Sequence, residues 1–274
     1  MPHPFRRKHG LMLVLGLLSA AVPLRAAQAD DPQQSASDPS WLDSAVEQAQ
    51  AWNMVIGGGF MVEPKFEGAD DVEIIPVPLF MADFGPYVSV DTEGLTINAF
   101  DYDDFSVKGR VGYDFGRDSD DDKHLHGLGD IDAGAVLGLD LAYELGPVEF
   151  TVALDKTIGG ADGFTAEFGA EYTVEFDQFQ FSIGPSFTWA DGNAMESYFG
   201  VSDRQSRRSG LSRFDADAGI KRVDLELTGL YMIDDHWMVR AEVTLGLLTG
   251  DAADSPVSQR NFQPSTMFLV GYKF

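Results

Sequence analysis

The 274-residue chain has no cysteine, so no disulfide stabilises the fold. Basic residues are scarce, with 19 Lys and Arg against 44 Asp and Glu. That balance excludes nucleic acid as a partner, because no excess of positive charge is available to neutralise phosphates. Long apolar runs are also missing. The run at Leu11–Leu18 is too short for a membrane-spanning helix, which needs about 20 apolar residues.

Residues 1–29 have the pattern of a secretory signal peptide. Arg6, Arg7 and Lys8 precede the short apolar run, and Ala27-Gln28-Ala29 provides small residues at a cleavage site. We therefore expect an exported protein that begins at Asp30. The signal holds four of the basic residues and no acid, so the mature chain keeps 15 basic and 44 acidic residues, a formal charge of −29. Such a charge disfavours an anionic membrane surface and requires acids in wet loops or a wet lumen.

Residues 30–50 are polar and acidic and are expected to form a periplasmic lead-in. Either one or two helical turns capped by Ser40 or a disordered tether would fit them. Residues 51–274 have a different pattern, in which apolar and polar side chains alternate with a period of two. Residues 164–176 are typical, with Phe164, Phe168 and Tyr172 on the apolar face.

The alternating segments predict an all-β fold of about twelve strands. Several of the segments are close to the 9–11 residues that a tilted strand needs to cross a bilayer, and they exceed ordinary soluble strands. A soluble β-sandwich is the alternative, but export and strand length favour a closed antiparallel transmembrane β-barrel. The expected strands lie near residues 52–62, 72–83, 86–91, 94–101, 105–115, 130–145, 147–156, 163–175, 178–190, 214–233, 236–249 and 264–274.

The connections between these strands predict an orientation. Those after even-numbered strands are short, and those after odd-numbered strands are mostly long, except the one near residues 91–94. Short periplasmic turns and longer extracellular loops are typical of the outer membrane of Gram-negative bacteria.

The last expected strand places Phe268, Val270, Tyr272 and Phe274 on one face. An apolar edge strand would be an aggregation hazard in water. We therefore expect it to pair with the first strand, closing the barrel with its aromatic face towards lipid and Tyr272 and Phe274 at the periplasmic interface.

Four loop motifs occur in order along the chain: Pro64-Lys65-Phe66-Glu67-Gly68-Ala69-Asp70-Asp71, Leu128-Gly129-Asp130-Ile131-Asp132, Tyr198-Phe199-Gly200-Val201-Ser202 followed by Ser209-Gly210-Leu211, and Gly250-Asp251-Ala252-Ala253-Asp254-Ser255-Pro256-Val257. In these stretches the chain resembles the MipA/OmpV family of outer-membrane proteins (MltA-interacting proteins), although Phe66 and Ala69 replace the usual Tyr and Ser. The resemblance implies a barrel that scaffolds a lytic transglycosylase with a peptidoglycan synthase. In some members it implies surface adhesion or an antibiotic response instead. It also implies that the barrel assembly machinery reads the terminal strand, and it supplies no catalytic residues.

One expected outer loop concentrates possible metal ligands, which are Asp118, Asp120, Asp121, Asp122, His124 and His126. Six oxygen and imidazole groups could hold a divalent cation, but the order does not match an EF-hand, and a solvated acidic loop is the favoured interpretation. An omptin-like protease would need a second carboxylate pair opposite them, and a lipase would need a serine beside a histidine. Neither pattern is found, so we expect neither enzyme activity nor a cofactor.

Two further sets of charged residues have a predicted role. The expected lumen-facing set is Lys108, Arg110, Asp130, Asp132, Glu167, Glu171, Asp224, Glu226, Arg240 and Glu242. It fits either a narrow cation-preferring channel or a salt-bridged filling in which Lys108 and Arg110 face Asp130 and Asp132, and the filling is favoured. The second set is Arg204, Arg207, Arg208 and Arg213 in the longest loop. Those arginines could bind lipopolysaccharide phosphates or neutralise neighbouring acidic loops.

Overall fold

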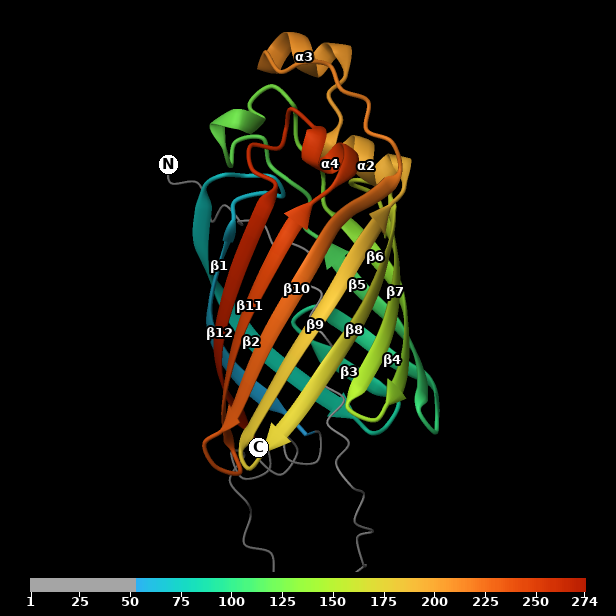
Figure 1. Ribbon diagram of the computed structural model, residues 1–274, viewed down its shortest axis with the longest axis vertical. Helices are drawn as coiled ribbons and strands as arrows, with labels where there is room; N and C mark the ends of the chain where they lie inside the picture. Colours follow the sequence, from blue (N-terminus) through green and yellow to red (C-terminus); the bar gives the residue numbers. More distant parts are fainter. Residues whose placement is uncertain (1–52) are drawn as a thin grey trace, which may run out of the picture.

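The computed structural model describes residues 53–274 and shows a closed antiparallel barrel (Figure 1). The expected signal peptide (1–29) and lead-in (30–50) lie outside the described residues. Each strand pairs with its neighbours in sequence, and β12 returns to β1. The strands are β1 (Val55–Pro64), β2 (Val72–Phe84), β3 (Val88–Asp91), β4 (Gly94–Tyr102), β5 (Phe105–Asp114), β6 (Gly134–Leu145), β7 (Val148–Ile158), β8 (Phe164–Phe176), β9 (Phe179–Ala190), β10 (Gly219–Met232), β11 (Trp237–Leu248) and β12 (Phe262–Lys273).

The predicted twelve-stranded barrel is confirmed, and most boundaries agree within about three residues. Two strands begin later than expected. β6 starts at Gly134 rather than at 130, and β10 starts at Gly219 rather than at 214. The alternating pattern continued into loop residues that form single isolated bridges instead, between Ile131 and Arg117 and between Phe214 and Val201.

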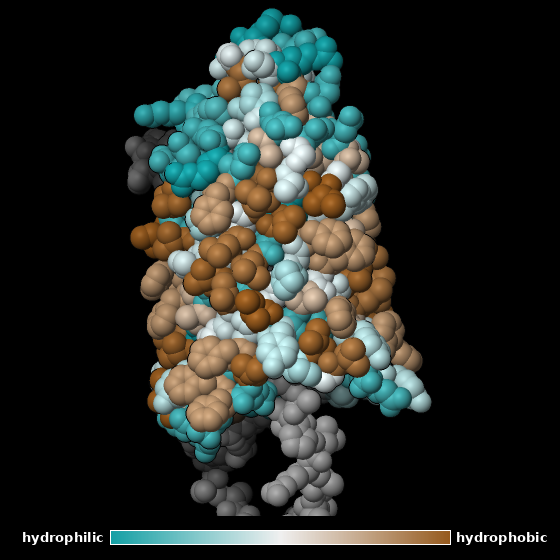
Figure 2. All heavy atoms as spheres, viewed as in Figure 1, coloured by the Kyte–Doolittle hydropathy of each residue, from teal (hydrophilic) through white to brown (hydrophobic). Residues whose placement is uncertain are grey.

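The outer wall of the barrel is apolar. Exposed apolar side chains recur along most of the strands, and Phe168 stacks on Phe187 across β8 and β9 with ring centroids 5.0 Å apart. Figure 2 shows these side chains as a hydrophobic belt between hydrophilic ends. Such a belt matches the acyl-chain region of a bilayer, where an exposed apolar surface costs nothing. None of the helices within residues 53–274 is long and apolar enough to cross a membrane.

The β1–β12 seam closes the barrel as expected. It runs from Val55 opposite Lys273 to Val62 opposite Thr266, and Phe60 packs beside Phe268 with centroids 5.9 Å apart. At its periplasmic end Tyr272 contacts the rings of Trp237 and Phe274, each with centroids 5.1 Å away. These rings form part of the interfacial aromatic girdle that outer-membrane barrels carry.

The long connections lie at the opposite end and contain the helical segments (Figure 1). They are η1 (Lys123–Leu125), α2 (Gly192–Phe199), α3 (Asp203–Ser209) and α4 (Gly250–Asp254). Caps fix the longer two: Asp191 accepts a hydrogen bond from the Ala194 N–H at the start of α2, and Ser202 and Gln205 form a capping box at the start of α3.

Candidate functional site: the capped extracellular mouth

Four long loops meet over the extracellular mouth and share an apolar core. The core joins the β1–β2, β5–β6, β9–β10 and β11–β12 connections, and its buried members are Phe66, Ala69, Leu125, Leu128, Val201 and Val257. These loops carry the four motifs on which the family resemblance was based. The motifs therefore specify one packed structure, which we call the cap.

A second apolar cluster fastens the cap to the strand ends. Met195 and Phe199 of α2 pack with Ala252 of α4 against Ala190 and Leu248, at the ends of β9 and β11. Met195 and Phe199 are each 1% exposed. Because packed apolar loops behave like a small domain core, the cap is a fixed part of the fold rather than a set of independent loops.

Polar contacts also join the loops. The buried Gln263 side chain accepts a hydrogen bond from the Gly68 N–H at 3.0 Å and donates to the Ala69 carbonyl at 3.1 Å. The His124 ring Nε2 lies 2.9 Å from the Pro256 carbonyl oxygen. Gln263 lies at the start of β12, directly after Phe262, and Gly68 follows β1, so the Gln263 bonds hold the cap across the β1–β12 seam.

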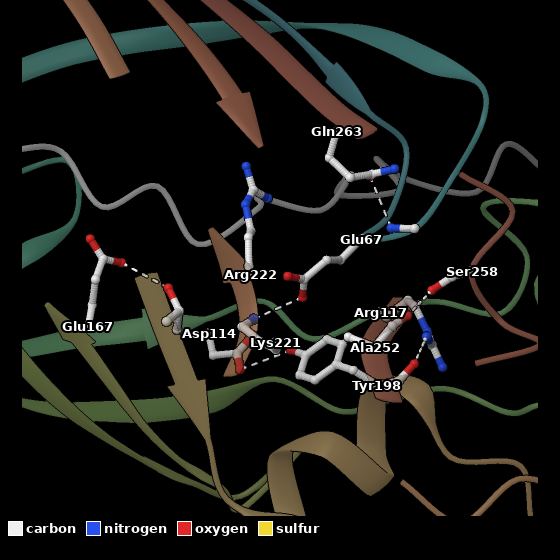
Figure 3. A network of polar contacts seen from close by, with 12 residues as sticks. Glu67, Asp114, Arg117, Glu167, Tyr198, Lys221, Arg222, Ala252, Ser258 and Gln263 are labelled. Atoms are coloured by element: carbon white, nitrogen blue, oxygen red, sulfur yellow. Dashed lines mark hydrogen bonds and ion pairs between the residues drawn. The ribbon is translucent and has the colours of Figure 1, made fainter. Parts of the chain in front are cut away.

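Beneath the cap lies a set of ionisable side chains that we call the mouth network (Figure 3). Its members are Glu67, Asp114, Arg117, Tyr198 and Lys221. The Lys221 ammonium lies 2.9 Å from the Glu67 carboxylate. Arg117 donates to the Tyr198 carbonyl at 2.7 Å, and the Tyr198 hydroxyl donates to Asp114 at 3.1 Å. The network thus links the first outer loop, β5, α2 and β10.

The mouth network holds its charged forms despite burial. Burial by itself would raise the pKa of Glu67, but Lys221 and Arg222 together hold that pKa below its ordinary value. Burial lowers the pKa of Arg117 to about 10, which still leaves it charged at neutral pH. Burial and the nearby Asp114 carboxylate raise the pKa of Tyr198, so its hydroxyl keeps the proton that it donates.

Acid should loosen the cap. A carboxyl group whose folded-state pKa is depressed contributes stability that is complete above its ordinary value of 4.5 and is lost as the pH falls through the lower folded value. We therefore expect ion conductance across planar bilayers to rise reversibly as the pH falls below the ordinary value of 4.5, because Glu67 is then protonated and releases Lys221. The Glu67→Gln variant should show little of this pH dependence. Equal pH dependence in both proteins would assign the effect to other carboxylates.

The lumen below the network contains a polar cavity of about 120 Å³, lined in part by Glu167, Asp224, Glu226 and Glu242. Cations accompany these acids. Arg222 lies 2.6 Å from Asp224, and Arg240 lies 2.7 Å from Glu242. Nearby serine and threonine hydroxyls also donate to the glutamates, such as Thr188 to Glu167 at 3.2 Å.

The basic pair on β5 has different partners from those expected. Asp130 and Asp132 precede β6, so they do not face Lys108 and Arg110, and that assignment is wrong. Asp130 instead accepts hydrogen bonds from Ser119 in the same loop. The register places Lys108 opposite Asp140, and Arg110 bonds to Asp140 at 3.3 Å and Asp155 at 2.8 Å.

The acidic loop folds around internal contacts. Asp122 accepts from the His124 N–H at 2.8 Å and pairs with Lys65 at 3.3 Å, and Asp118 accepts from the Asp120 N–H. Over the described part of the chain, no group of three or more His, Asp or Glu side chains is arranged to hold a metal ion.

The arginine cluster lies farthest from the apolar belt. α3 carries Arg204, Arg207 and Arg208 on an exposed surface at the tip of the molecule (Figure 1). Arg213 pairs with Asp215 at 3.0 Å and lies 3.8 Å from Asp203. Arg213 therefore neutralises neighbouring acidic residues. Lipopolysaccharide binding by Arg204, Arg207 and Arg208 stays a prediction.

The alternating pattern does not identify the mouth network, and Lys221 and Glu67 show why. The register of β9 against β10 shifts between Ile220 and Arg222, which places both Lys221 and Arg222 on the cavity wall. A strict alternation would send one of them outward, and a β-bulge removes that constraint. Glu67 stands out in the sequence only as part of a loop motif. No local sequence pattern indicates that this loop carboxylate points into the lumen.

A family model described as "MltA-interacting protein MipA" matches residues 56–274. The chain belongs to this family. A relative called "Putative outer membrane protein YiaT" from Escherichia coli K12 is 25% identical over 232 residues, 82% of this chain and 93% of that protein. The "MltA-interacting protein" of Escherichia coli K12 is 26% identical over 160 residues, 58% of this chain and 63% of that protein. This family member is an outer-membrane barrel.

Solved structures share the barrel class with this family member at low similarity. The COG4313 outer membrane channel from Pseudomonas putida F1 is 10% identical with a TM-score of 0.41, covering 81% of this chain and 93% of that chain. OprD from Pseudomonas aeruginosa is 13% identical with a TM-score of 0.37, covering 81% of this chain and 66% of that chain.

Proposed function

We propose that the barrel acts by binding rather than by catalysis, as a membrane anchor for a periplasmic enzyme that remodels peptidoglycan. The name of the family and of one relative, MltA-interacting protein, supports a murein enzyme as the partner. The cap supports binding over transport, because packed loops and ion pairs fill the mouth.

The observation that carries this proposal is the charge of the periplasmic rim. Its turns hold no lysine or arginine, and exposed acids crowd them and the adjoining strand ends. These acids are Asp101, Asp103, Asp104, Glu144, Glu175, Asp177, Asp234 and Asp235. A ring of one sign attracts a partner of the opposite sign, so we infer that the rim receives a basic face of the enzyme.

Neutralising two rim charges should weaken this docking. Asp103 and Asp177 lie in left-handed turns with φ of 50° and 52°, a conformation that asparagine adopts readily. The double variant Asp103→Asn, Asp177→Asn therefore changes charge without changing the turns. We expect the association rate with a purified lytic transglycosylase to fall about fivefold at low salt, and the difference to shrink as salt screens the rim.

Asp162→Asn is the matched control. Asp162 has the same left-handed conformation, φ 45°, but lies in an extracellular loop. An equal loss of binding in this control would mean that the acidic residues of the periplasmic rim are not the docking site. If crosslinking in the cell envelope recovers no murein enzyme while planar bilayers show steady cation conductance, the docking proposal is wrong. A narrow cation-preferring channel, for which the acid-lined cavity is the supporting observation, would then take its place.

A further inference from the structure

The barrel wall has a gap beside β2. β3 is only four residues long, and β2 pairs with it only over Met81–Phe84. The remaining nine residues of β2, Val72–Phe80, have a paired strand only on the β1 side within the described chain. The unpaired edge is therefore roughly 30 Å long at about 3.3 Å per residue.

The gap lies in the extracellular half of the wall. The β3–β4 hairpin turns between Asp91 and Gly94, with Asp91 opposite Met81 near the periplasmic end of β2. In Figure 1 the hairpin stays low in the barrel, whereas β2 continues up to the cap. We call the gap above the β3–β4 hairpin, bordered on one side by the upper part of β2, the window.

The sequence of β2 fits an open edge. Pro76 and Pro78 have no N–H to donate to a neighbouring strand, and prolines within sheets are found at edges for that reason. They also hinder the pairing of another chain with this edge. The short third strand and the short connection at residues 91–94, which broke the pattern of long outer loops, are the sequence signs of the window.

The lumen wall beside the window is apolar. Met61, Met267 and Leu269 form a buried cluster from β1 and β12, and Ile75, Val77 and Leu79 of β2 pack against it. These β2 residues alternate with Ile74, Pro76 and Phe80 on the outer face, so this strand is apolar on both faces. A strand apolar on both faces has apolar surroundings on both sides. The other lumen walls carry the paired charges described above.

We propose that an acyl chain of a surrounding membrane lipid enters through the window and lies against this apolar wall. The outward-facing side chains around the window, such as Ile74, Phe80 and Tyr113, are apolar and exposed, so the medium outside it is acyl chains. The wall inside offers six apolar side chains. Charged residues border it, with Glu63 and Glu73 beyond one end and the Arg240–Glu242 pair on the neighbouring strand β11. The lead-in at residues 30–50 is polar and acidic, which makes it a poor occupant of such a surface. This lipid site is independent of docking at the periplasmic rim.

Photocrosslinking in the mature chain tests the proposal. The absence of native cysteine allows a benzophenone maleimide to be attached to one introduced cysteine at a time. After refolding into phosphatidylcholine vesicles and irradiation, we expect phospholipid adducts by mass spectrometry for Leu79→Cys in the lumen and for Ile74→Cys on the outer face. Ser186→Cys faces the cavity from β9, behind a complete wall, and should give no phospholipid adduct.

Lipid retention gives a second measurement that does not depend on a bulky label. Native mass spectrometry of detergent-purified barrel should show a bound phospholipid that Val77→Asn loses and Thr244→Asn, on the polar cavity wall, keeps. Folding of each variant is checked by heat-modifiable migration on gels. The proposal is overturned if Leu79→Cys crosslinks only to the protein itself, or if Val77→Asn retains lipid as the native chain does.

Discussion

Gly59→Ala should abolish stable closure of the barrel. Gly59 lies opposite Leu269 in the β1–β12 seam, and an added Cβ would fall onto the backbone carbonyl of Phe268. A backbone atom cannot rotate away as a side chain can, so the two strands must separate. We expect a loss of about 3 kcal/mol or more, at the upper end of overpacking effects, because the seam between β1 and β12 closes the barrel.

The measurement is the folded, heat-modifiable band on gels together with the urea midpoint in vesicles. Gly109→Ala is the control, because Gly109 also lies within a strand but an added Cβ would meet nothing within 4 Å. It should fold like the native chain. Normal folding of Gly59→Ala would mean that β1 shifts against β12 without cost, which the paired register of the seam argues against.

Glu67→Gln should open the extracellular mouth. The glutamate is the anion that Lys221 faces, and both side chains are mostly buried, at 11% and 18% exposure. Removing one partner of a buried ion pair costs about 3 kcal/mol, because the remaining charge is left without compensation. That corresponds to a shift of roughly a hundredfold towards the uncapped state. We expect single-barrel conductance in planar bilayers to appear or rise markedly at neutral pH.

Asp162→Asn provides the comparison for this prediction. Asp162 pairs with Lys156 at 3.0 Å, but the two side chains are 66% and 43% exposed. An exposed pair contributes less than about 1 kcal/mol, so conductance should not change. A native barrel that already conducts as well as Glu67→Gln would show that the cap does not close the lumen. The channel would then be the better account of function.

The barrel itself follows from the sequence because strand alternation is a local property. The strand count, the closing strand and the orientation all depended on residues within one segment or on the lengths between segments. The lumen charges were assigned by the same rule, and Glu167, Asp224, Glu226 and Glu242 do line the cavity. The rule failed at Asp130 and Asp132, because alternation continued beyond the point where β6 begins.

The cap could not be predicted because its contacts join distant segments. Phe66, Leu125, Val201 and Val257 have no common spacing, and each lies in a loop without the alternating pattern of the strands. Glu67 and Lys221 are 154 residues apart. The bulge that turns Lys221 inward is also visible only in the pairing of β9 with β10. The local sequence pattern therefore predicts the strands of the barrel wall. The loops that pack over the extracellular mouth are seen only in the three-dimensional structure.

The bond between Gly68 and Gln263, which spans 195 residues, constrains the order in which the molecule can be made. The first and last outer loops can meet only after β12 has reached β1, and pairing of such distant segments is slow because the intervening chain must be restrained first. A partly assembled barrel therefore has an incomplete cap. Closure of the extracellular mouth therefore accompanies the last step of assembly. A chain that stops before β12 pairs with β1 would leave an open pore in the membrane.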